Sequence, residues 1–476
     1  MQRFTGYRWR DWGSALGWGV SAAVLLLLFG PSATWSAVTD GPDVQLQISI
    51  LLVKPAVVLI SDEVAAEVTV DCGDGKLRPV RPDPIYETGS GFIIHPDGYI
   101  ATNGHVVTRF YDMNAPELSR DFLEKSVAQA CGPALAQLDE RTRAERLKAI
   151  AATPANRGKV HLFKRLQVHL STGEIYGAEV KAYSPAINPD ALRVAEERAA
   201  AGMPEVGERS GRDVAIIKID AHDLPTIPLA PVNNRLKLGE PIFVVGYPGV
   251  VLNHDFLSRK SQLEASVTVG RVSGFKLDVT NRRVIQTDAS ITWGNSGGPA
   301  FNFRGEVIGV ATFISTTFEG DQAIQGFNFL IPVDSVREFT KQIGLTPESD
   351  TVFMREWRQA VRAYFAGDFS ATIAHTDAAQ KIMIGFPDIE RLGEDARMQA
   401  EMAAGSGILS RQLGFGLAGV GIVLLAGSGW WVVRRRRIRR ALAMHRVTEP
   451  GRTRPRRPSR RRLPRVPPVF PRRFPR

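Results

Sequence analysis

Short apolar runs separated by turns that contain Gly and Pro recur from about residue 45 to residue 343. Residues 91–102 (GFIIHPDGYIAT) hold two such runs around a Pro-Asp-Gly turn, which predicts a β-hairpin. Residues 166–183 (LQVHLSTGEIYGAEVKAY) repeat the pattern around Ser-Thr-Gly. Many evenly spaced strands joined by such turns predict a mainly β fold, either a barrel or a sandwich.

Two stretches interrupt the strand pattern. Residues 114–157 are charged and rich in alanine, with leucine and isoleucine at nearly helical spacing, and residues 185–210 contain the helix-forming run ALRVAEERAAAG. We expect both stretches to be helical insertions on a β scaffold.

The pattern changes after residue 343. Residues 344–408 are predicted to form a helical spacer, in which residues 356–382 make two helices joined at Gly367-Asp368. The spacing of aromatic, glycine and proline residues in this spacer resembles one tetratricopeptide unit. The alternative is a plain helical spacer that packs against the β domain.

Two uncharged apolar segments predict how the chain is placed at a membrane. Residues 14–29 follow three arginines and resemble a secretory signal, so residues 1–38 are predicted to be a signal sequence or an uncleaved anchor. Residues 413–433 contain no charge in 21 positions. At about 1.5 Å per residue such a helix matches a hydrocarbon core of about 30 Å. Trp430 and Trp431, followed by four arginines, predict its cytoplasmic end.

The charge of the chain is unevenly distributed. Residues 434–476 hold 18 arginines against one acidic residue, a net of +17, whereas residues 39–410 carry a net of −9 within a whole chain of +11. The Arg/Pro-rich tail is predicted to be disordered, cytoplasmic and attracted to anionic lipid. The acidic main body is predicted to be extracytoplasmic, and its charge gives no reason to expect nucleic acid as a partner.

The chain has two cysteines, Cys72 and Cys131. Outside the cytoplasm they could form a disulfide that would attach the first insertion to the amino-terminal strand, and the alternative is two free thiols. No Cys or His spacing in the sequence is typical of a metal site, and we expect neither a metal nor another cofactor.

Residues 292–299 (TWGNSGGP) surround Ser296 with residues that weaken regular structure. One interpretation is a tight turn between strands, because Gly and Asn are common turn formers. The other is a serine nucleophile beside an oxyanion hole, which needs backbone N–H groups aimed at one point. The second interpretation requires a base and an orienting acid in a fixed chain order.

The order of the other polar residues selects among the known hydrolase arrangements. The α/β-hydrolase elbow requires an acid and then a histidine after the serine, but only His375 and His445 follow Ser296, in the helical spacer and beyond the apolar segment. The strand–helix alternation expected around a subtilisin-type site is absent from the sequence. His105 in TNGHVV and Asp213 in GRDVAIIKID give the remaining order of His, Asp and Ser.

Five motifs in order resemble the trypsin-like HtrA/Deg serine proteases over roughly residues 46–343: GSGFIIHPDGYIATNGHVV, DVAIIKI, SVTVGRVSG, QTDASITWGNSGGP and GFNFLIPV. The resemblance implies two packed six-stranded, chymotrypsin-like β-barrels over residues 45–343, with the active site between them. It also implies that His105 is the general base, Asp213 its orienting acid and Ser296 the nucleophile. The oxyanion hole is assigned to the backbone N–H groups of Gly294, Asn295 and Ser296, with Asn295 shaping the turn.

The sequence departs from this family in its accessory parts. His105 and Asp213 are 108 residues apart because the insertions intervene, and no motif for a PDZ domain follows the protease region. We expect a serine endopeptidase on a bacterial-type plasma membrane, single-pass, or two-pass if the first segment is uncleaved. By resemblance its substrates are unfolded or damaged extracytoplasmic proteins and it assembles as a homo-oligomer, such as a trimer. The alternative is a catalytically silent or narrowly specific scaffold or signalling protein that recruits partners through its helical hairpin and basic tail.

Overall fold

The computed structural model describes residues 41–444 except for 112–114, 188–192, 195–196, 199, 203–210, 233–235, 259–260, 262–263 and 317–322. Side chains are described at all of these positions other than 313–316, 323–325, 405–423 and 441–444. The chain divides into two units, Met1–Glu401 and Met402–Arg476. The predicted signal segment, most of the predicted insertion at 185–210 and the tail beyond residue 444 lie outside the described residues.

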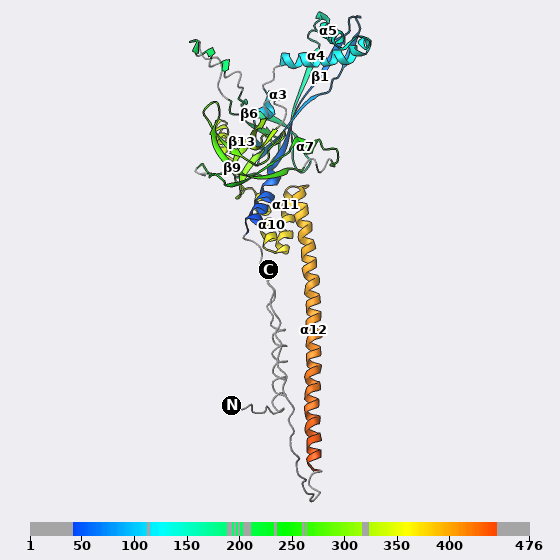
Figure 1. Cartoon of the computed structure of the whole chain (residues 1–476), viewed down its shortest axis with the longest axis vertical. Coiled ribbons are helices and arrows are strands. Elements are labelled where there is room, and N and C mark those ends of the chain that lie inside the picture. Colours follow the sequence, from blue (N-terminus) through cyan, green and yellow to red (C-terminus); the bar gives the residue numbers. More distant parts are fainter. Residues whose placement is uncertain are drawn as a thin grey trace, which may run out of the picture. The chain divides into compact units, whose positions relative to one another are not determined.

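Six strands of the amino-terminal half close into a barrel (Figure 1). In ring order they are β1 (Val57–Asp71), β3 (Ile85–His95), β4 (Tyr99–Thr102), β7 (Val214–Ile219), β6 (Ile175–Ser184) and β5 (Val160–His169). β1 pairs antiparallel with β3 and also with β5, and the second pairing closes the ring. β2 (Leu77–Val80) adds a seventh strand at the carboxyl end of β1.

Six further strands form a second closed barrel. In ring order they are β10 (Arg283–Thr287), β13 (Ala323–Pro332), β12 (Val307–Thr316), β11 (Pro299–Asn302), β8 (Pro241–Gly246) and β9 (Ser266–Leu277). Closure removes the sheet edges that would otherwise expose unpaired backbone groups. The predicted mainly β fold with two six-stranded barrels is therefore confirmed, and the predicted hairpin at 91–102 is the β3–β4 pair.

Apolar side chains fill both barrels because most strands alternate or are buried on both faces. β7 (VAIIKI) is buried at every position except Lys218. One core runs through the first barrel and includes Tyr247, Phe301 and Val307 of the second, so the two barrels share a continuous apolar interface. Short elements connect or cap the strands: η1 (Lys54–Ala56), η2 (His105–Val107), α3 (Thr108–Tyr111), α7 (Gly249–Leu252) and α9 (Val333–Gln342).

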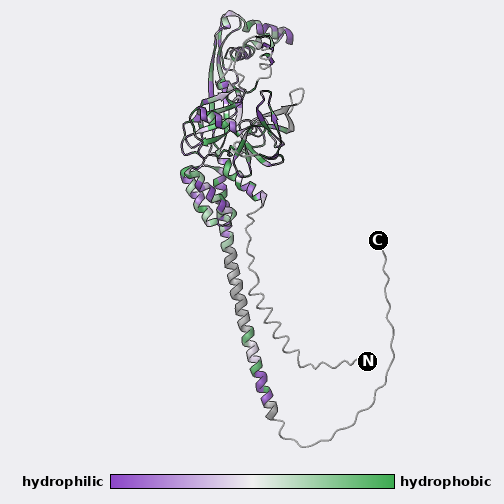
Figure 2. Cartoon of the chain, turned by 90° about the vertical axis from the view of Figure 1, so that its left-hand side faces the viewer, coloured by the Kyte–Doolittle hydropathy of each residue, from purple (hydrophilic) through white to green (hydrophobic). Residues whose placement is uncertain are grey.

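The long strand β1 continues beyond the first barrel into an arm, which we define as residues 64–72, 77–80 and 115–162 (Figure 1). Its helical part is α4 (Ala115–Cys131), η3 (Gly132–Leu135), α5 (Glu140–Ala151) and η4 (Pro154–Asn156), within the stretch for which helices were expected. The arm has its own small core, made of Val64, Ala66, Val68, Val70, Phe122, Val127, Cys131 and Ala151. Hydrophilic residues cover much of the outside of its helices (Figure 2).

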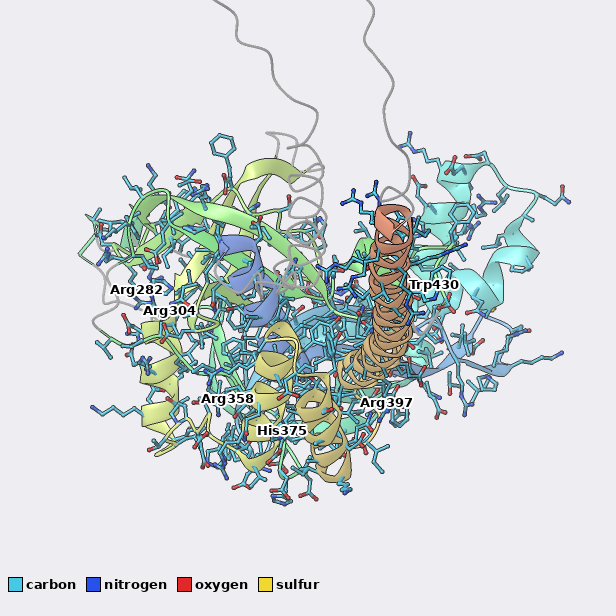
Figure 3. All side chains as sticks on the ribbon, turned by 90° about the horizontal axis from the view of Figure 1, so that it is seen from below. Arg282, Arg304, Arg358, His375, Arg397 and Trp430 are labelled. Atoms are coloured by element: carbon cyan, nitrogen blue, oxygen red, sulfur yellow. A yellow bond between two sulfur atoms is a disulfide. The ribbon has the colours of Figure 1, made fainter. Side chains whose placement is uncertain are left out.

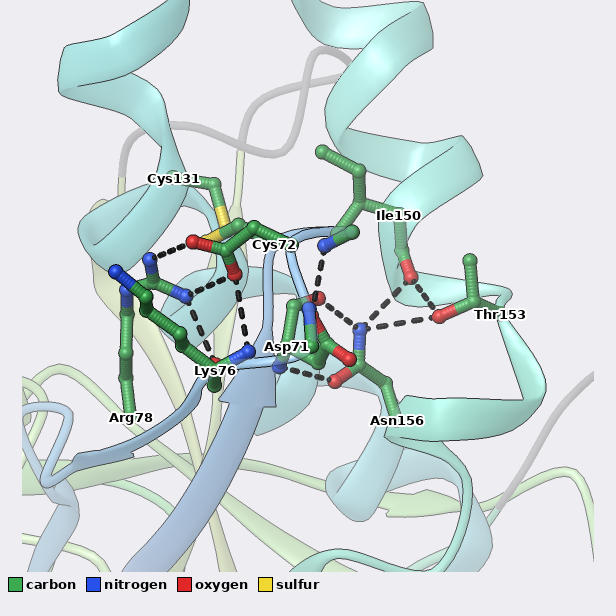
Figure 4. Close-up of a disulfide and its surroundings, with 11 residues drawn as sticks. Asp71, Cys72, Lys76, Arg78, Cys131, Ile150, Thr153 and Asn156 are labelled. Carbon is green, nitrogen blue, oxygen red and sulfur yellow. Dashed lines mark hydrogen bonds and ion pairs between the residues drawn. A yellow bond between two sulfur atoms is a disulfide. The ribbon is translucent and has the colours of Figure 1, made fainter.

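A disulfide and one asparagine hold the end of the arm together (Figure 4). Cys72, just after β1, is joined to Cys131 at the end of α4, with their Cα atoms 5.7 Å apart. Of the two states left open by the sequence, the structure has the disulfide. Asn156 exchanges two hydrogen bonds with the backbone of Asp71, at 2.7 and 2.9 Å, and its amide also donates to the Ile150 carbonyl at 2.9 Å.

The first described segment differs from the expected strand pattern, because α2 (Pro42–Val53) is a helix. Proline in the first helical turn costs no hydrogen bond, which favours a helix start at Pro42. The helix is stabilised from two sides. Ser49 donates to the Phe303 carbonyl of the second barrel at 2.6 Å, and Leu51 and Leu52 pack in a separate core with the helical spacer.

The spacer forms three helices: α10 (Val352–Phe365), α11 (Phe369–Ile382) and the start of α12 (Pro387–Met444). Asp368 caps α11 by accepting a hydrogen bond from the Ala371 amide, at the predicted Gly-Asp turn. Trp357 is fully buried and its Nε1 donates to the Leu51 carbonyl at 2.8 Å. The spacer therefore does not bury its apolar face alone, since α2 supplies part of the core.

The helix α12 has 58 residues and crosses the boundary between the two units. No helix in the described part of the chain has a stretch long and apolar enough to cross a membrane. The predicted membrane segment, 413–433, includes residues 413–423, whose side chains lie outside the described part. The arginines at 434–440 give the carboxyl-terminal part of α12 a strongly hydrophilic character (Figure 2). The membrane anchor stays a prediction.

Candidate active site

His105, Asp213 and Ser296 come from three separate segments and meet where the two barrels adjoin. His105 begins η2, directly after β4, and Asp213 precedes β7 in the same barrel. Ser296 lies in the loop between β10 and β11 of the second barrel. Thr312 of β12 is hydrogen-bonded to both Asp213 and Ser296, and His105 is hydrogen-bonded to Asp213.

His105 and Asp213 form an acid–base pair in which Asp213 is buried and His105 is partly accessible to solvent. The His105 Nδ1 lies 2.9 Å from each carboxylate oxygen of Asp213. Because a carboxylate only accepts hydrogen bonds, Nδ1 carries the proton and the Nε2 lone pair of the neutral ring is left to accept another. Burial alone would lower the pKa of His105, but the charge and hydrogen bond of Asp213, with a further contribution from Glu87, outweigh burial and raise the pKa.

The Asp213 carboxylate accepts three types of hydrogen bond. Besides the imidazole, it accepts from the His105 backbone N–H at 2.8 Å and from the Thr312 Oγ1 at 2.5 Å. Burial would raise its pKa, but the charge of His105 and these hydrogen bonds hold the pKa below its ordinary value. The carboxylate is thus ionised, although it is almost inaccessible to solvent.

The backbone at Asp213 is itself constrained. Its φ of +50° lies in the left-handed region, which is uncommon for residues other than glycine. The Asn103 side-chain amide donates to the Asp213 carbonyl at 2.8 Å, and the Asp213 N–H donates to the Pro185 carbonyl at 3.0 Å. These contacts hold the strained residue in place, as is common at functional sites.

Ser296 is connected to the pair through Thr312 rather than directly. Its Oγ donates to the Thr312 carbonyl at 3.2 Å, whereas the Thr312 hydroxyl donates to Asp213. Among the described residues, no hydrogen bond joins Ser296 to the His105 ring. Catalytic hydrogen bonds are often long or misaligned before a substrate binds.

The peptide between Trp293 and Gly294 has a defined orientation. The Trp293 carbonyl accepts a hydrogen bond from the Gly249 N–H at 2.7 Å. The C=O and N–H groups of a trans peptide point in opposite directions, so the Gly294 N–H points away from Gly249. It has no hydrogen-bond partner among the described residues. It is thus available to an oxygen from outside.

The next peptides in the loop show which of the predicted oxyanion donors have a free N–H group. The Asn295 carbonyl accepts from the Gly298 N–H at 2.9 Å, so the Ser296 N–H points the opposite way and is also unpaired within the described residues. The Asn295 N–H donates to the Thr292 carbonyl at 3.0 Å and is engaged inside the loop. The expectation that Asn295 contributes an oxyanion donor is therefore wrong, because a local turn uses its N–H. Its part is to shape the turn.

Two glycines in this loop occupy positions where a side chain does not fit. Gly294 has φ +93°, and a Cβ there would lie 2.5 Å from the Tyr247 carbonyl oxygen. Gly297 has φ +84° and would bring a Cβ into the carbonyl oxygen of Ser90. The glycines around Ser296 therefore permit a close approach between the loop and the neighbouring strands.

Ser90, in β3, fixes the loop from the other barrel and had no assigned role in the sequence. Its N–H donates to the Ser296 carbonyl at 2.7 Å, and its hydroxyl donates to the Gly294 carbonyl at 2.8 Å and accepts from the Tyr247 N–H at 2.8 Å. Thr102 in turn donates to the Ser90 carbonyl at 2.7 Å. Ser90 stands in the conspicuous GSGF run, whereas nothing in the sequence around Thr312 marks its contact with Asp213.

Part of the chain is similar to known peptidases. Residues 89–310 match the family model for a trypsin-like peptidase domain. The chain is 38% identical over 141 residues to a probable periplasmic serine endoprotease DegP-like of Pseudomonas savastanoi pv. phaseolicola, covering 29% of this chain and 26% of that protein. It is 30% identical over 185 residues to a protein of the same description from Hahella chejuensis, covering 38% and 36%. It is 34% identical over 134 residues to the serine protease Do-like HtrA of Lactococcus lactis subsp. lactis, covering 28% and 32%.

The similarity to these relatives covers only part of each protein. The chain covers between 26% and 36% of the length of these three relatives. The chain thus contains a trypsin-like peptidase domain similar to those of serine endoproteases of the DegP/HtrA type. No group of three or more His, Cys, Asp and Glu side chains within the described residues could hold a metal ion.

Proposed function

We propose that this protein is a membrane-anchored serine endopeptidase in which Ser296 is the nucleophile, His105 the general base and Asp213 the acid that orients it. The observation that carries the proposal is the chain of hydrogen bonds from His105 through Asp213 and Thr312 to Ser296. The similarity to serine endoproteases supports the same reaction. A surface turn would have no use for a buried, ionised carboxylate behind a partly accessible histidine.

The steps of the reaction follow from which of these groups can give or accept a proton. The Ser296 hydroxyl turns from the Thr312 carbonyl to the Nε2 of His105 and gives up its proton while Oγ attacks the peptide carbonyl carbon. The electron pair of the C=O bond moves to the oxygen, where the N–H groups of Gly294 and Ser296 stabilise the negative charge. The C–N bond then breaks and the leaving amine takes the proton from His105. Water repeats the sequence on the acyl ester and frees Ser296.

Asp213 serves this cycle by stabilising the imidazolium that forms halfway. Its two hydrogen bonds to the ring hold Nδ1 protonated and Nε2 toward the substrate. The raised pKa of His105 sets the pH dependence. The ring must be neutral to accept a proton, so the rate rises with pH through the raised pKa of His105, above its ordinary value of about 6.5.

Substrate class and location follow from the sequence and from the relatives. Relatives described as periplasmic endoproteases support extracytoplasmic polypeptides as substrates, unfolded or damaged ones by resemblance. The uncharged segment 413–433 and the arginines after it support an anchor in a plasma membrane with the tail at 434–476 in the cytoplasm, near anionic lipid. A homo-oligomer is part of the same proposal by resemblance.

The direct test uses a serine-reactive fluorophosphonate on the purified full-length protein. We expect covalent labelling of a single peptide that contains Ser296, and loss of labelling together with loss of casein hydrolysis in Ser296→Ala. Ser261→Ala, which changes an exposed serine outside the proposed site, is the matched control and should keep both labelling and hydrolysis. Absence of labelling in the folded wild-type protein would favour the catalytically silent scaffold instead.

A further inference from the structure

A cavity of about 660 Å³ lies against the Asp213 side of the proposed catalytic pair. His105, Asp213 and Thr312 form part of its wall, and Ser296 does not. The rest of the wall comes from the β9–β10 hairpin, from β13, from Ser335 of α9, and from residues 186–187 and 211–212 at the two ends of the second insertion. Its volume lies in the range of sites for small organic ligands.

The wall of this cavity is mainly apolar. The apolar side chains that line it are Ala186, Ile187, Leu277, Val279, Val284, Phe329 and Ile331. Val284 and Ile331 are buried, whereas Leu277 and Val279 are more than half exposed. The cavity therefore has an apolar interior and reaches solvent near the tip of the β9–β10 hairpin.

One cationic side chain on this wall has a hydrogen-bond donor without an acceptor. The Nη1 of Arg282 is buried and has no hydrogen-bond partner among the described residues (Arg282 is labelled in Figure 3). A buried donor on a charged group costs free energy unless an acceptor reaches it, and an anionic acceptor is the most favourable. The Arg282 guanidinium would therefore be stabilised by an anionic acceptor bound in the cavity.

Among the described residues, no acidic side chain forms an ion pair with Arg282. Asp278 accepts from the backbone N–H groups of Thr280 and Arg282 and from the Thr280 hydroxyl, within the hairpin turn. Glu338 forms an ion pair with Arg212. Burial, and then the nearby positive charge of Arg282, lower the pKa of Arg212. Two guanidinium groups thus lie close together beside the cavity, and one of them is neutralised.

We propose that this cavity binds a small carboxylate that carries an unbranched acyl chain, with the carboxylate on Arg282 and the chain along Val284, Phe329 and Ile331. A planar guanidinium matches a carboxylate in geometry as well as in charge. A polypeptide fits less well, because its amide groups would lose their hydrogen bonds to water against a mostly apolar wall.

The test compares octanoate with octanamide on the full-length protein by isothermal titration calorimetry. The two probes share a chain and differ in charge, so octanoate should bind at least about tenfold more tightly, the difference expected for one charge-assisted hydrogen bond. Arg282→Met keeps an unbranched side chain but removes the guanidinium, and it should reduce octanoate binding to the level of octanamide. Arg304→Met is the matched control, because Arg304 lies on the same barrel and is paired with Glu306 (Figure 3).

A second variant tests whether the ligand binds inside the cavity and is not merely attracted to the positive charge. Ser335→Phe narrows the cavity from α9 without changing a charge, and it should weaken octanoate and octanamide by similar factors. Equal binding of octanoate by the wild type and Arg282→Met overturns the proposal. So does undetectable octanoate binding, or tight binding of a hexapeptide with a carboxyl-terminal leucine in place of octanoate.

Discussion

The two barrels and the arm are stabilised in different ways. The barrels are closed rings of strands whose apolar cores meet across their interface. The arm rests on eight buried residues, one disulfide and the hydrogen bonds of Asn156. A small core seldom stabilises a segment without a covalent constraint.

The comparison shows where a chain can hold a strained, charged site. Asp213 combines a left-handed backbone with a buried carboxylate, and the surrounding strands of both barrels fix it through Asn103, Thr312 and His105. In the arm, by contrast, the hydrogen bonds of Asn156 lie at its end, and its helices expose much of their surface to solvent. We therefore expect changes in the barrels to alter chemistry, and changes in the arm to alter local opening.

The largest effect is expected for Asp213→Asn. The amide keeps the shape but supplies no charge for the imidazolium and favours the wrong His105 tautomer, so turnover should fall by about 10⁴-fold. The measurement is steady-state hydrolysis of a peptide substrate. Hydrogen exchange in the arm should remain as in the wild type. A loss of less than tenfold would show that another group orients His105.

The division into barrels and a helical insertion could largely be predicted from the sequence, because the segments that form the barrels combine alternating apolar residues with turn residues. The histidine, aspartate and serine stand in runs whose order alone distinguishes hydrolase classes. Ser90 and Thr312 could not be assigned, because their roles depend on contacts between strands distant in sequence. Likewise, α2 is apolar enough to be taken for a strand, and the packing of Leu51 and Leu52 against the helical spacer, which helps to stabilise the helix, could not be predicted.

The next effect concerns the disulfide. Replacing Cys72 and Cys131 together by serine removes a link across 59 residues, for which the chain-entropy model gives about 4 kcal/mol. We expect hydrogen exchange to accelerate strongly in α4 and in the end of β1. Fluorophosphonate labelling of Ser296 should persist at its original rate. Loss of that labelling would mean that the arm and the barrels unfold as one unit.

Asp62 lies at the root of the arm, where β1 leaves the barrel opposite Glu87. Its side chain is fully buried, Oδ2 accepts from the Phe110 N–H at 2.8 Å, and Oδ1 has no partner among the described residues. Burial raises the pKa of Asp62 to about 6, against the Phe110 hydrogen bond and the charges of Arg109 and Lys164, while Glu87 adds to the rise.

A raised carboxyl pKa makes the folded state bind the proton more tightly than the unfolded state. Stability is therefore highest below about pH 4 for this group and declines as pH rises to about 6, by about 3 kcal/mol in total. Asp62→Asn should remove that decline, protecting β1 and α3 amides at pH 8 and giving no gain at pH 4. Protection that rises equally at both pH values would contradict a titration of Asp62.

The smallest effect is expected within the arm, for Arg78→Met. Arg78 forms an ion pair with Asp74 in the turn that follows Cys72, with N–O distances of 2.6 and 2.9 Å (Figure 4). Both side chains are at least a third exposed, and exposed ion pairs contribute little to stability. Exchange of amides in the arm should change by no more than about twofold, with Arg141→Met on α5 as the matched control. If Arg78→Met instead opened the arm as far as the double cysteine variant does, the turn rather than the disulfide would hold its end, and the contrast with the barrels would rest on a different contact.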